Sequence, residues 1–214
     1  MGAGALGARR VSAQEAALAS TQEHHTSTGL DNTKMAMWAF LGSECLFFGS
    51  LITTYLLYRS KVLPDSGPVP SEIYDIPYTS VSSFVLLMSS LTMVLALSCV
   101  QRGDVRGMRI WLLATALLGV TFVGGQIFEF TDFVEEGLTL GSSPAGSAFF
   151  VLTGFHGAHV SVGILMLLSL VGMSMSDKLQ PGAARKVELI GLYWHFVDIV
   201  WVVIFTVVYL IPLE

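Results

Sequence analysis

Long apolar runs separated by short polar stretches dominate the chain from about residue 35 onward. Each run is long enough to cross a bilayer as a helix, because about 20 residues at roughly 1.5 Å each cover the roughly 30 Å of hydrocarbon. The breaks between the runs are rich in proline, glycine or charged residues, which are typical of helix ends and loops. The pattern predicts five spans, at residues 35–58, 78–100, 109–130, 147–175 and 188–213.

We therefore expect an all-α integral membrane bundle of five transmembrane helices within residues 34–214. Residues 1–33 are rich in small and polar residues and lack the apolar core of a signal peptide, so we predict a flexible tail there. No internal repeat of convincing length is visible, which argues against an inverted-repeat transporter.

Composition supports a membrane protein and excludes other classes. The sequence is 53% hydrophobic and only 13% charged, whereas charged residues make up about a quarter of a typical soluble domain. The net charge of -5 and the lack of a dense basic cluster argue against a nucleic-acid partner. Cys45 and Cys99 lie in different apolar runs without a CxxC pattern, so neither a disulfide framework nor a zinc knuckle is indicated.

The basic residues predict the orientation of the spans in the membrane. Only Arg59 and Lys61 fall on one side, and the loop that holds Asp132, Glu135 and Glu136 has no Lys or Arg. The positive-inside rule then places the N-terminus in the cytoplasm and the C-terminus outside. The basic residues of the cytoplasmic side are Arg9, Arg10, Lys34, Arg102, Arg106, Arg109, Lys178, Arg185 and Lys186.

Ionisable residues inside the apolar runs are the most informative part of the sequence. In the last span His195 and Asp198 are three residues apart, and Glu188 lies seven residues before His195, so the three share one helix face. Such a stripe is costly in hydrocarbon unless it faces protein or water, so we expect it to pack against other helices. Every other span except the second also carries candidate polar residues: Glu44, Gln126, Glu129, His156 and His159.

Depth suggests which of these residues meet. Counting inward along helices of alternating direction puts Glu44, His159, His195 and Asp198 roughly 10–16 Å from the cytoplasmic surface. His156 falls near the midplane, and Glu129 falls closer to the outer surface. We expect the first four to lie in one layer.

Three interpretations of this layer compete. The polar groups could satisfy one another by interhelical hydrogen bonds. They could hold a metal or haem, but the sequence has no Glu-x-x-His or His-x-x-x-His pair among them. They could handle protons, because burial disfavours the charged form of a carboxyl group. For Glu44 we favour proton handling over a purely structural role, and we expect a hydrophobic carbodiimide to label it preferentially.

Four segments carry a resemblance to a known family. They are SECLFFG at 43–49, GQIFEF at 125–130, FFVLTGFHGAHV at 149–160 and YWHFVDIVW at 193–201. In this order and spacing they resemble signature segments of subunit III of the haem-copper terminal oxidases. The likeness extends from about residue 35 to the end and implies packed transmembrane helices without a redox centre, docked on the catalytic subunit I.

The resemblance also has consequences for single residues and for lipids. Glu44 matches the family's buried glutamate that reacts with hydrophobic carbodiimides. This chain lacks the first two helices of the seven-helix members and so resembles the short bacterial form. In the longer members those two helices wall a lipid-filled cleft. In some bacterial oxidases an extended subunit I supplies them. Residues that match conserved polar positions or join the same polar network are Gln126, Glu129, His156, His159, Glu188, His195 and Asp198.

The function implied is that of a non-redox accessory subunit of a proton-pumping oxidase in the bacterial cytoplasmic (inner) membrane. The chain itself would be neither catalytic nor metal-binding, and would support stability and proton uptake while its partners reduce oxygen to water. The protein partners would be subunits I and II, which hold the haems and copper. Bound phospholipid and a respiratory supercomplex are the other expected partners.

The electron donor and the class of protein have alternatives. We expect cytochrome c as donor, because SEC, GQIFEF and RGDVRGMRIW are more like that branch, with a quinol oxidase as the alternative. A stand-alone membrane metalloprotein and an ion channel are the competing classes.

Overall fold

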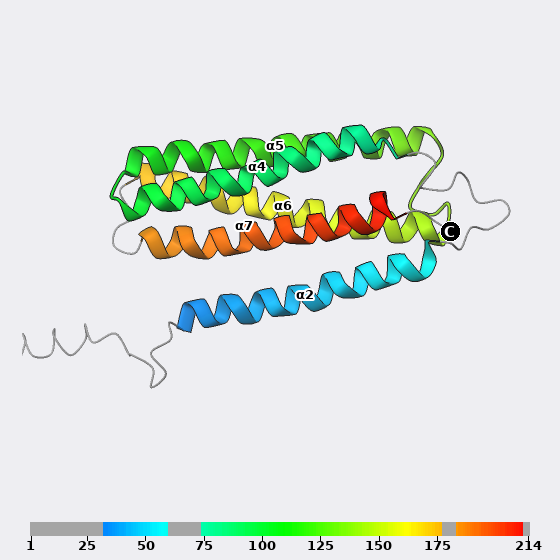
Figure 1. Ribbon diagram of the computed structural model, residues 1–214, viewed down its shortest axis with the longest axis horizontal. Helices are drawn as coiled ribbons and strands as arrows, with labels where there is room; N and C mark the ends of the chain where they lie inside the picture. The colour runs from blue at the N-terminus through cyan, green and yellow to red at the C-terminus, as the bar shows by residue number, and fades with distance from the viewer. Residues whose placement is uncertain (1–31, 60–73, 177–182, 212–214) are drawn as a thin grey trace, which may run out of the picture. The chain divides into compact units, whose positions relative to one another are not determined.

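The computed structural model describes residues 32–59, 74–176 and 183–211. The predicted tail, residues 1–33, lies outside this part except for Asn32 and Thr33, which begin the first helix. The helices are α2 (Asn32–Tyr58), α4 (Ile76–Gln101), α5 (Val105–Glu135), α6 (Pro144–Met175) and α7 (Ala183–Phe205), and the π-helical turn η1 (Thr206–Leu210) continues α7 (Figure 1).

The predicted all-α bundle is confirmed in this part of the chain. Five helices are long and apolar enough to cross a membrane, the last one counted together with η1. The predicted boundaries need correction, because α4, α5, α6 and α7 each begin several residues earlier than the apolar runs. Polar capping residues come before the runs. Asp75, Asp104 and Ser143 accept hydrogen bonds from the backbone N–H groups three residues further on.

Two glycines close the ends of α4 and α5. Gly103 and Gly137 have φ angles of 79° and 91°, a conformation that suits a residue without Cβ. Asp104 N–H donates to the Cys99 carbonyl at 2.9 Å, and Leu138 N–H donates to the Phe133 carbonyl at 2.9 Å. These are the bonds of the Schellman ending, which satisfies the last carbonyls of each helix.

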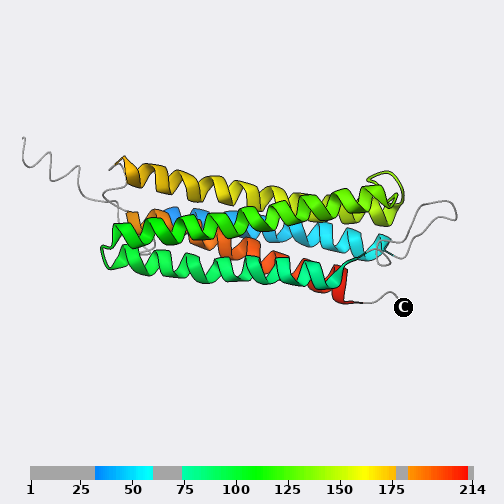
Figure 2. The ribbon, with the colours of Figure 1, turned by 90° about the horizontal axis from the view of Figure 1, so that it is seen from above.

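The helices α4, α5, α6 and α7 form a ring in which each packs against two others. The neighbouring pairs are α4 with α5, α5 with α6, α6 with α7, and α7 with α4 (Figures 1 and 2). Serines of α4 join it to α7. Trp201 Nε1 donates to Ser83 Oγ at 2.8 Å, and Trp194 Nε1 donates to Ser89 Oγ at 2.8 Å. Both indoles are buried among apolar groups that cannot accept a hydrogen bond, so the serine hydroxyls provide the acceptors that the indole N–H groups need.

The chain divides into two compact units, residues 1–40 and residues 41–214, and only the second is described here as an arrangement. Within it, α2 buries a narrow stripe, with Leu41, Phe48 and Tyr55 at a spacing of seven residues. Such spacing keeps the side chains on one line of a helix, the geometry of a single packing seam. The Phe48 ring lies 4.9 Å from the His159 ring of α6 and 6.4 Å from the Phe196 ring of α7, which places this seam against both helices.

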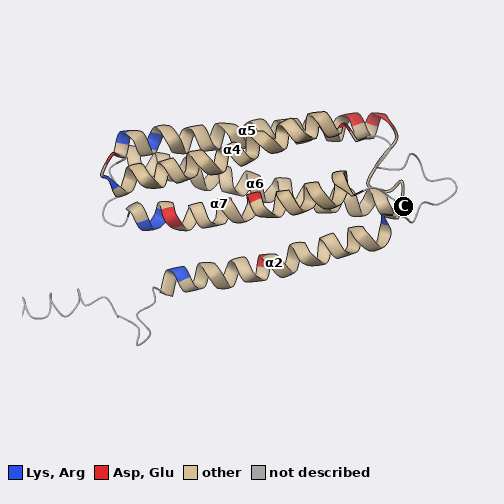
Figure 3. Ribbon diagram, in the orientation of Figure 1, with Lys and Arg blue, Asp and Glu red and all other residues tan. Residues whose placement is uncertain are grey.

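Charge separates the two ends of the α4–α7 ring (Figure 3). We call the end where α4 joins α5 the basic end; Arg102, Arg106, Arg109, Arg185 and Lys186 lie there and outnumber the acidic Asp104 and Glu188. We call the other the acidic end; Asp75, Asp132, Glu135 and Glu136 lie there. At the basic end Arg109 Nε donates to Ser174 Oγ at 2.8 Å, which ties the start of α5 to the end of α6.

Candidate functional site: the polar residues of the bundle

Glu44 of α2 and His159 of α6 form a hydrogen-bonded pair. The distance from Glu44 Oε2 to His159 Nε2 is 3.1 Å, and the side chains are 17% and 19% exposed respectively. The other ring nitrogen, Nδ1, lies 2.7 Å from the Phe155 carbonyl oxygen. A carbonyl only accepts, so Nδ1 carries a hydrogen. Either Glu44 donates as the neutral acid to Nε2, or Nε2–H donates to the carboxylate, so the pair shares one proton between the two atoms.

Aromatic rings surround this pair. The Phe48 ring centre is 4.9 Å from the His159 ring and the Phe47 ring centre is 6.0 Å from it. Phe155 lies edge-on to Phe47 at 5.3 Å. Tyr193 of α7 adds a polar contact, since its hydroxyl donates to the His159 carbonyl at 3.0 Å. The proton shared by Glu44 and His159 therefore lies in a mainly apolar environment, where hydrogen bonds and charges interact more strongly than in water.

A second cluster joins α4 to α7. Ser90 Oγ is hydrogen-bonded to Asp198 Oδ2 and lies 3.0 Å from His195 Nδ1. Asp198 is buried, and its Oδ1 atom has no hydrogen-bond partner among the described residues. His195 is half-buried. Glu188, two turns before His195 on the same face, is also half-buried.

His156 lies inside the ring rather than at either cluster. It is fully buried, and its Nε2 lies 3.2 Å from the Val197 carbonyl of α7, to which it must donate. Its ring packs on Trp201 with centres 4.8 Å apart and faces the edge of Phe122 at 5.8 Å. This arrangement uses the histidine to join α6 to α7, and its Nδ1 has no partner within the described residues.

Gln126 and Glu129 contact different helices although they share a face of α5. Gln126 Nε2 donates to the Thr153 carbonyl of α6 at 2.7 Å. Glu129 Oε1 accepts from Thr79 Oγ1 of α4 at 2.7 Å and from the Tyr209 hydroxyl of η1 at 3.3 Å. Both side chains are buried. Tyr74, which precedes α4, packs against Tyr209 with ring centres 4.5 Å apart and the ring planes tilted by 40°. Burial, and the nearby Tyr55, raise the pKa of Tyr74 well above its ordinary value.

The structure thus resolves the expected single layer into separate contacts. Glu44 meets His159, whereas His195 and Asp198 share Ser90 on another side of α7. Sequence reasoning missed the hydroxyl groups that bind these residues. The sequence did contain a sign of these hydroxyl groups, because serine and threonine lie along one side of the second span, which has no Asp, Glu, His, Lys or Arg. These are Thr79, Ser83, Ser89 and Ser90.

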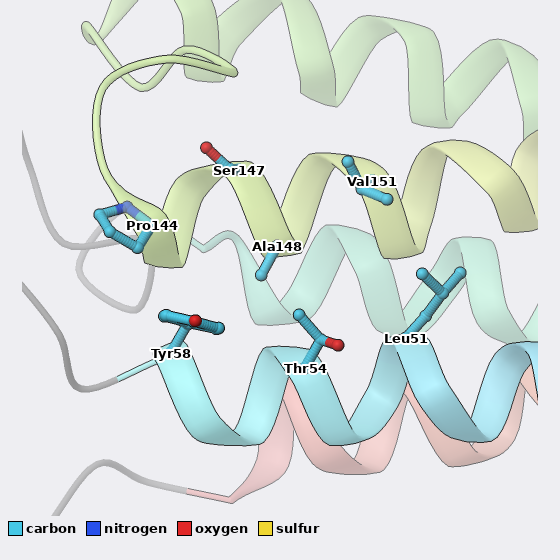
Figure 4. Close-up of a pocket in the computed structure, with 7 residues that line it drawn as sticks. All are labelled: Leu51, Thr54, Tyr58, Pro144, Ser147, Ala148 and Val151. Carbon is cyan, nitrogen blue, oxygen red and sulfur yellow. The ribbon is translucent and has the colours of Figure 1, made fainter.

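No set of three or more His, Cys, Asp or Glu side chains in the described ranges is placed to hold a metal ion. An apolar cavity of about 290 Å³ lies instead between α2 and α6 near the acidic end (Figure 4). In it Leu51 and Thr54 of α2 point toward the α6 backbone. A shallower hollow of about 260 Å³ continues along α6 past Phe150, Gly154 and Phe155. The lining residues of the first cavity are Leu51, Thr54, Tyr58, Pro144, Ser147, Ala148 and Val151.

Comparison with known proteins identifies the family. The family model for cytochrome c oxidase subunit III matches residues 9–212, nearly the whole chain. The chain belongs to the cytochrome c oxidase subunit III family. Its subunit III relatives include cytochrome c oxidase subunit 3 of Bacillus sp. (strain PS3), 41% identical over 84% of this chain and 86% of that protein. They also include quinol oxidase subunit 3 of Bacillus spizizenii, 38% identical over 89% of this chain and 92% of that protein.

Membership of the subunit III family confirms the resemblance seen in the four sequence segments. It makes the chain a multi-pass membrane subunit of a respiratory haem-copper oxidase in its five-helix form, and implies partner oxidase subunits. A third relative, probable cytochrome c oxidase subunit 3 of Nocardia farcinica, is 34% identical over 90% of this chain and 95% of that protein. Relatives from both cytochrome c and quinol oxidases therefore align along most of their length.

Proposed function

We propose that this subunit III supports proton uptake by the catalytic subunit of its oxidase, and that the Glu44–His159 pair is the group through which it does so. The chain has no redox role in this proposal. Haems and copper belong to subunits I and II, with subunit I the main contact, and the complex reduces oxygen to water. The observation that carries the proposal is the 3.1 Å contact between Glu44 Oε2 and His159 Nε2 inside the membrane-length helices.

The chemistry of the pair supports this role. A carboxyl and an imidazole that share one proton exchange it with little movement, because both atoms keep a hydrogen bond in either form. Partial exposure of both side chains leaves the pair accessible to a neighbouring subunit with which it can exchange a proton, which a fully buried pair would not be. Ionisable residues inside membrane spans are costly, and they often mark ion pathways and proton relays.

The decisive test compares Glu44→Ala with the parent in the assembled oxidase. Proton release per electron and oxygen consumption are measured together in reconstituted vesicles over a pH series. We expect normal assembly and haem spectra but lower pumping, slower turnover or faster inactivation, with Glu44→Asp between the two because it keeps the acid on a shorter side chain. Cys45→Ala, the exposed neighbour of Glu44, is the matched control.

If Glu44→Ala equals the parent in rate, pumping ratio and lifetime at every pH, the pair is only a structural contact. A haem Soret band or stoichiometric metal in the isolated chain would instead mean that it is not the non-redox subunit proposed here. Proton conduction at channel rates by the chain alone in vesicles would support an ion channel.

For the electron donor we propose cytochrome c, with quinol as the alternative. Relatives named for each donor align with this chain to a similar extent, so the proposal rests on the segments SEC, GQIFEF and RGDVRGMRIW. Oxygen consumption by the purified complex with reduced cytochrome c, compared with consumption with a soluble quinol, is the direct assay. Turnover with quinol alone would reverse the assignment.

We also propose that an acyl chain of a phospholipid occupies the cavity between α2 and α6. The walls are almost entirely apolar, while Thr54, Tyr58 and Ser147 add hydroxyls among them. Ala148→Trp should fill the cavity and reduce the phospholipid that co-purifies, measured by extraction and mass spectrometry. Leu165→Trp, at an exposed position of the same helix, should not. Equal lipid content in the two variants would contradict the site.

A further inference from the structure

The cluster of His195, Ser90 and Asp198 reaches the outer surface of the α4–α7 pair. Ile199 and Val202 follow His195 on the same side of α7, and both are exposed. On α4, Leu87 and Val94 lie on either side of Ser90 and are exposed as well. We call the surface formed by Leu87, Ser90, Val94, His195, Ile199 and Val202 the α4–α7 face. It is an apolar surface with a half-buried histidine between the two helices.

The hydrogen bonds of the cluster leave one nitrogen of His195 unused. Ser90 has a single hydroxyl hydrogen, which it donates to Asp198. The contact of 3.0 Å between Ser90 Oγ and His195 Nδ1 is then made by the hydrogen on Nδ1. In a neutral ring this leaves Nε2 as an acceptor. No described residue donates to it, and Asp198 Oδ1 is buried without a donor as well.

Asp198 Oδ1 is buried beyond the reach of a neighbouring molecule, whereas the half-buried His195 side chain can be reached. An acceptor without a donor is unfavourable inside a membrane. Transfer of a polar group to an apolar medium without a hydrogen bond costs several kcal/mol, and acyl chains have no donor to offer. The neighbouring side chains on the α4–α7 face are apolar and do not donate either. A protein partner can therefore donate a hydrogen bond to His195 Nε2 on this face, whereas lipid acyl chains cannot.

We propose that the α4–α7 face docks a transmembrane helix of a partner oxidase subunit, and that a hydroxyl, amide or indole N–H of that helix donates to His195 Nε2. The exposed aliphatic side chains supply the packing around this bond, as small and apolar groups do where membrane helices meet. The proposal rests on the assignment of the chain to an oxidase complex, and it is independent of any role for Glu44.

Photo-crosslinking from defined positions tests the docking surface in the intact complex. A benzophenone amino acid replaces Ile199 on the face, and in separate variants replaces Leu117 of α5 or Leu165 of α6, both exposed on other helices. After irradiation in native membranes, adducts are identified by mass spectrometry. We expect Ile199 to yield an adduct with the haem-bearing subunit and the two control positions to yield lipid adducts.

A second measurement probes the hydrogen bond itself. His195→Phe removes Nε2 but keeps a flat ring, and Val202→Trp adds bulk to the same face. Each should release subunit III from the complex at a lower detergent concentration than the parent, whereas Leu117→Trp should not. His195→Gln, which keeps a side-chain acceptor, should restore part of the retention.

The outcomes separate this proposal from the proposed function. Lipid adducts alone from Ile199 in an intact complex, or partner adducts only from Leu117 or Leu165, would overturn the docking surface and leave the proton-uptake role standing. An adduct between two copies of this chain would also overturn it. Absence of any co-purifying haem-bearing subunit would contradict the proposed function as well.

Discussion

Gly163 of α6 lies directly against the indole ring of Trp194 in α7. A Cβ atom at Gly163 would lie 2.8 Å from two ring carbons of Trp194. A Cβ at Gly119 of α5 would lie 2.6 Å from another carbon of the same indole. The indole thus packs closely against two glycines and is fixed by the hydrogen bond to Ser89 of α4, so one side chain of α7 contacts the other three helices of the ring.

This packing predicts a large effect of a single methyl group. Gly163→Ala should destabilise the subunit by about 1–3 kcal/mol, because the close-packed ring has nowhere to move. Thermal loss of subunit III from the purified complex is the measurement. Gly172→Ala, in the same helix with open space around it, is the control and should match the parent. Equal stability of both variants would show that Trp194 shifts easily.

The pattern of apolar runs was enough to predict the five helices, because an apolar run of membrane length has few possible structures other than a transmembrane helix. Helix starts were less predictable, because the capping side chains of Asp75, Asp104 and Ser143 lie in the polar breaks, and the apolar runs begin only after them. Caps depend on the local backbone conformation, which only the folded chain fixes.

Which polar residues contact one another was also only partly predictable from the sequence. Depth counting placed Glu44 and His159 at one level, and they do meet. It also placed His195 there, but depth gives no rotation about the helix axis. His195 faces α4 and finds Ser90 instead. Rotation is set by packing against neighbours such as Trp194 and Trp201, which a linear pattern does not contain.

Ser83 is predicted to hold α4 against α7 through Trp201. Ser83→Ala leaves the buried Trp201 Nε1–H without an acceptor, which in membrane proteins costs about 0.6–1.7 kcal/mol. Ser80→Ala removes a serine that bonds only to its own helix, at the Ile76 carbonyl. Retention of subunit III during heating should fall for Ser83→Ala and stay unchanged for Ser80→Ala; the opposite order would contradict the role of this bond.

Glu129 is predicted to act as a hydrogen-bond acceptor for Thr79 and Tyr209. Glu129→Gln keeps an oxygen at the same distance and should preserve most of the stability. Glu129→Ala leaves the buried Tyr209 hydroxyl without this acceptor and leaves Thr79 Oγ1 with only the Asp75 carbonyl, 2.9 Å away. We expect a loss of about 1–3 kcal/mol for the alanine variant. The readout is unfolding of the purified complex in denaturant. An equal loss for the Gln and Ala variants would mean that the negative charge, which both lack, matters more than the acceptor oxygen.

The charge difference between the two ends of the ring predicts the topology. With the basic end in the cytoplasm, Gly141→Cys in the α5–α6 turn should react in intact cells with a membrane-impermeant maleimide. Ser176→Cys, just after α6 at the basic end, should react only after the cells are opened. The parent, with Cys45 and Cys99, sets the background. Labelling of Ser176→Cys alone in intact cells would invert the orientation.

The last prediction concerns the proton shared by Glu44 and His159. When a carbodiimide reacts with a carboxylic acid, the acid gives its proton to a carbodiimide nitrogen and the carboxyl oxygen adds to the central carbon. In the parent, His159 competes for that proton through Nε2. His159→Phe removes the competing base and keeps an aromatic ring beside Phe47 and Phe48. Loss of a charge-assisted hydrogen bond is worth roughly 1.5–3 kcal/mol, so labelling of Glu44 should rise by about tenfold or more.

Labelling is measured by mass spectrometry of the peptide that contains Glu44, at several times after addition of the reagent. Ser161→Ala is the matched control, since Ser161 bonds only to the Gly157 carbonyl of its own helix. Proton pumping of His159→Phe should fall together with that of Glu44→Ala, because the proton then has one site instead of two between which to move. Unchanged labelling with unchanged pumping would mean that His159 fixes the position of Glu44 without taking part in proton exchange.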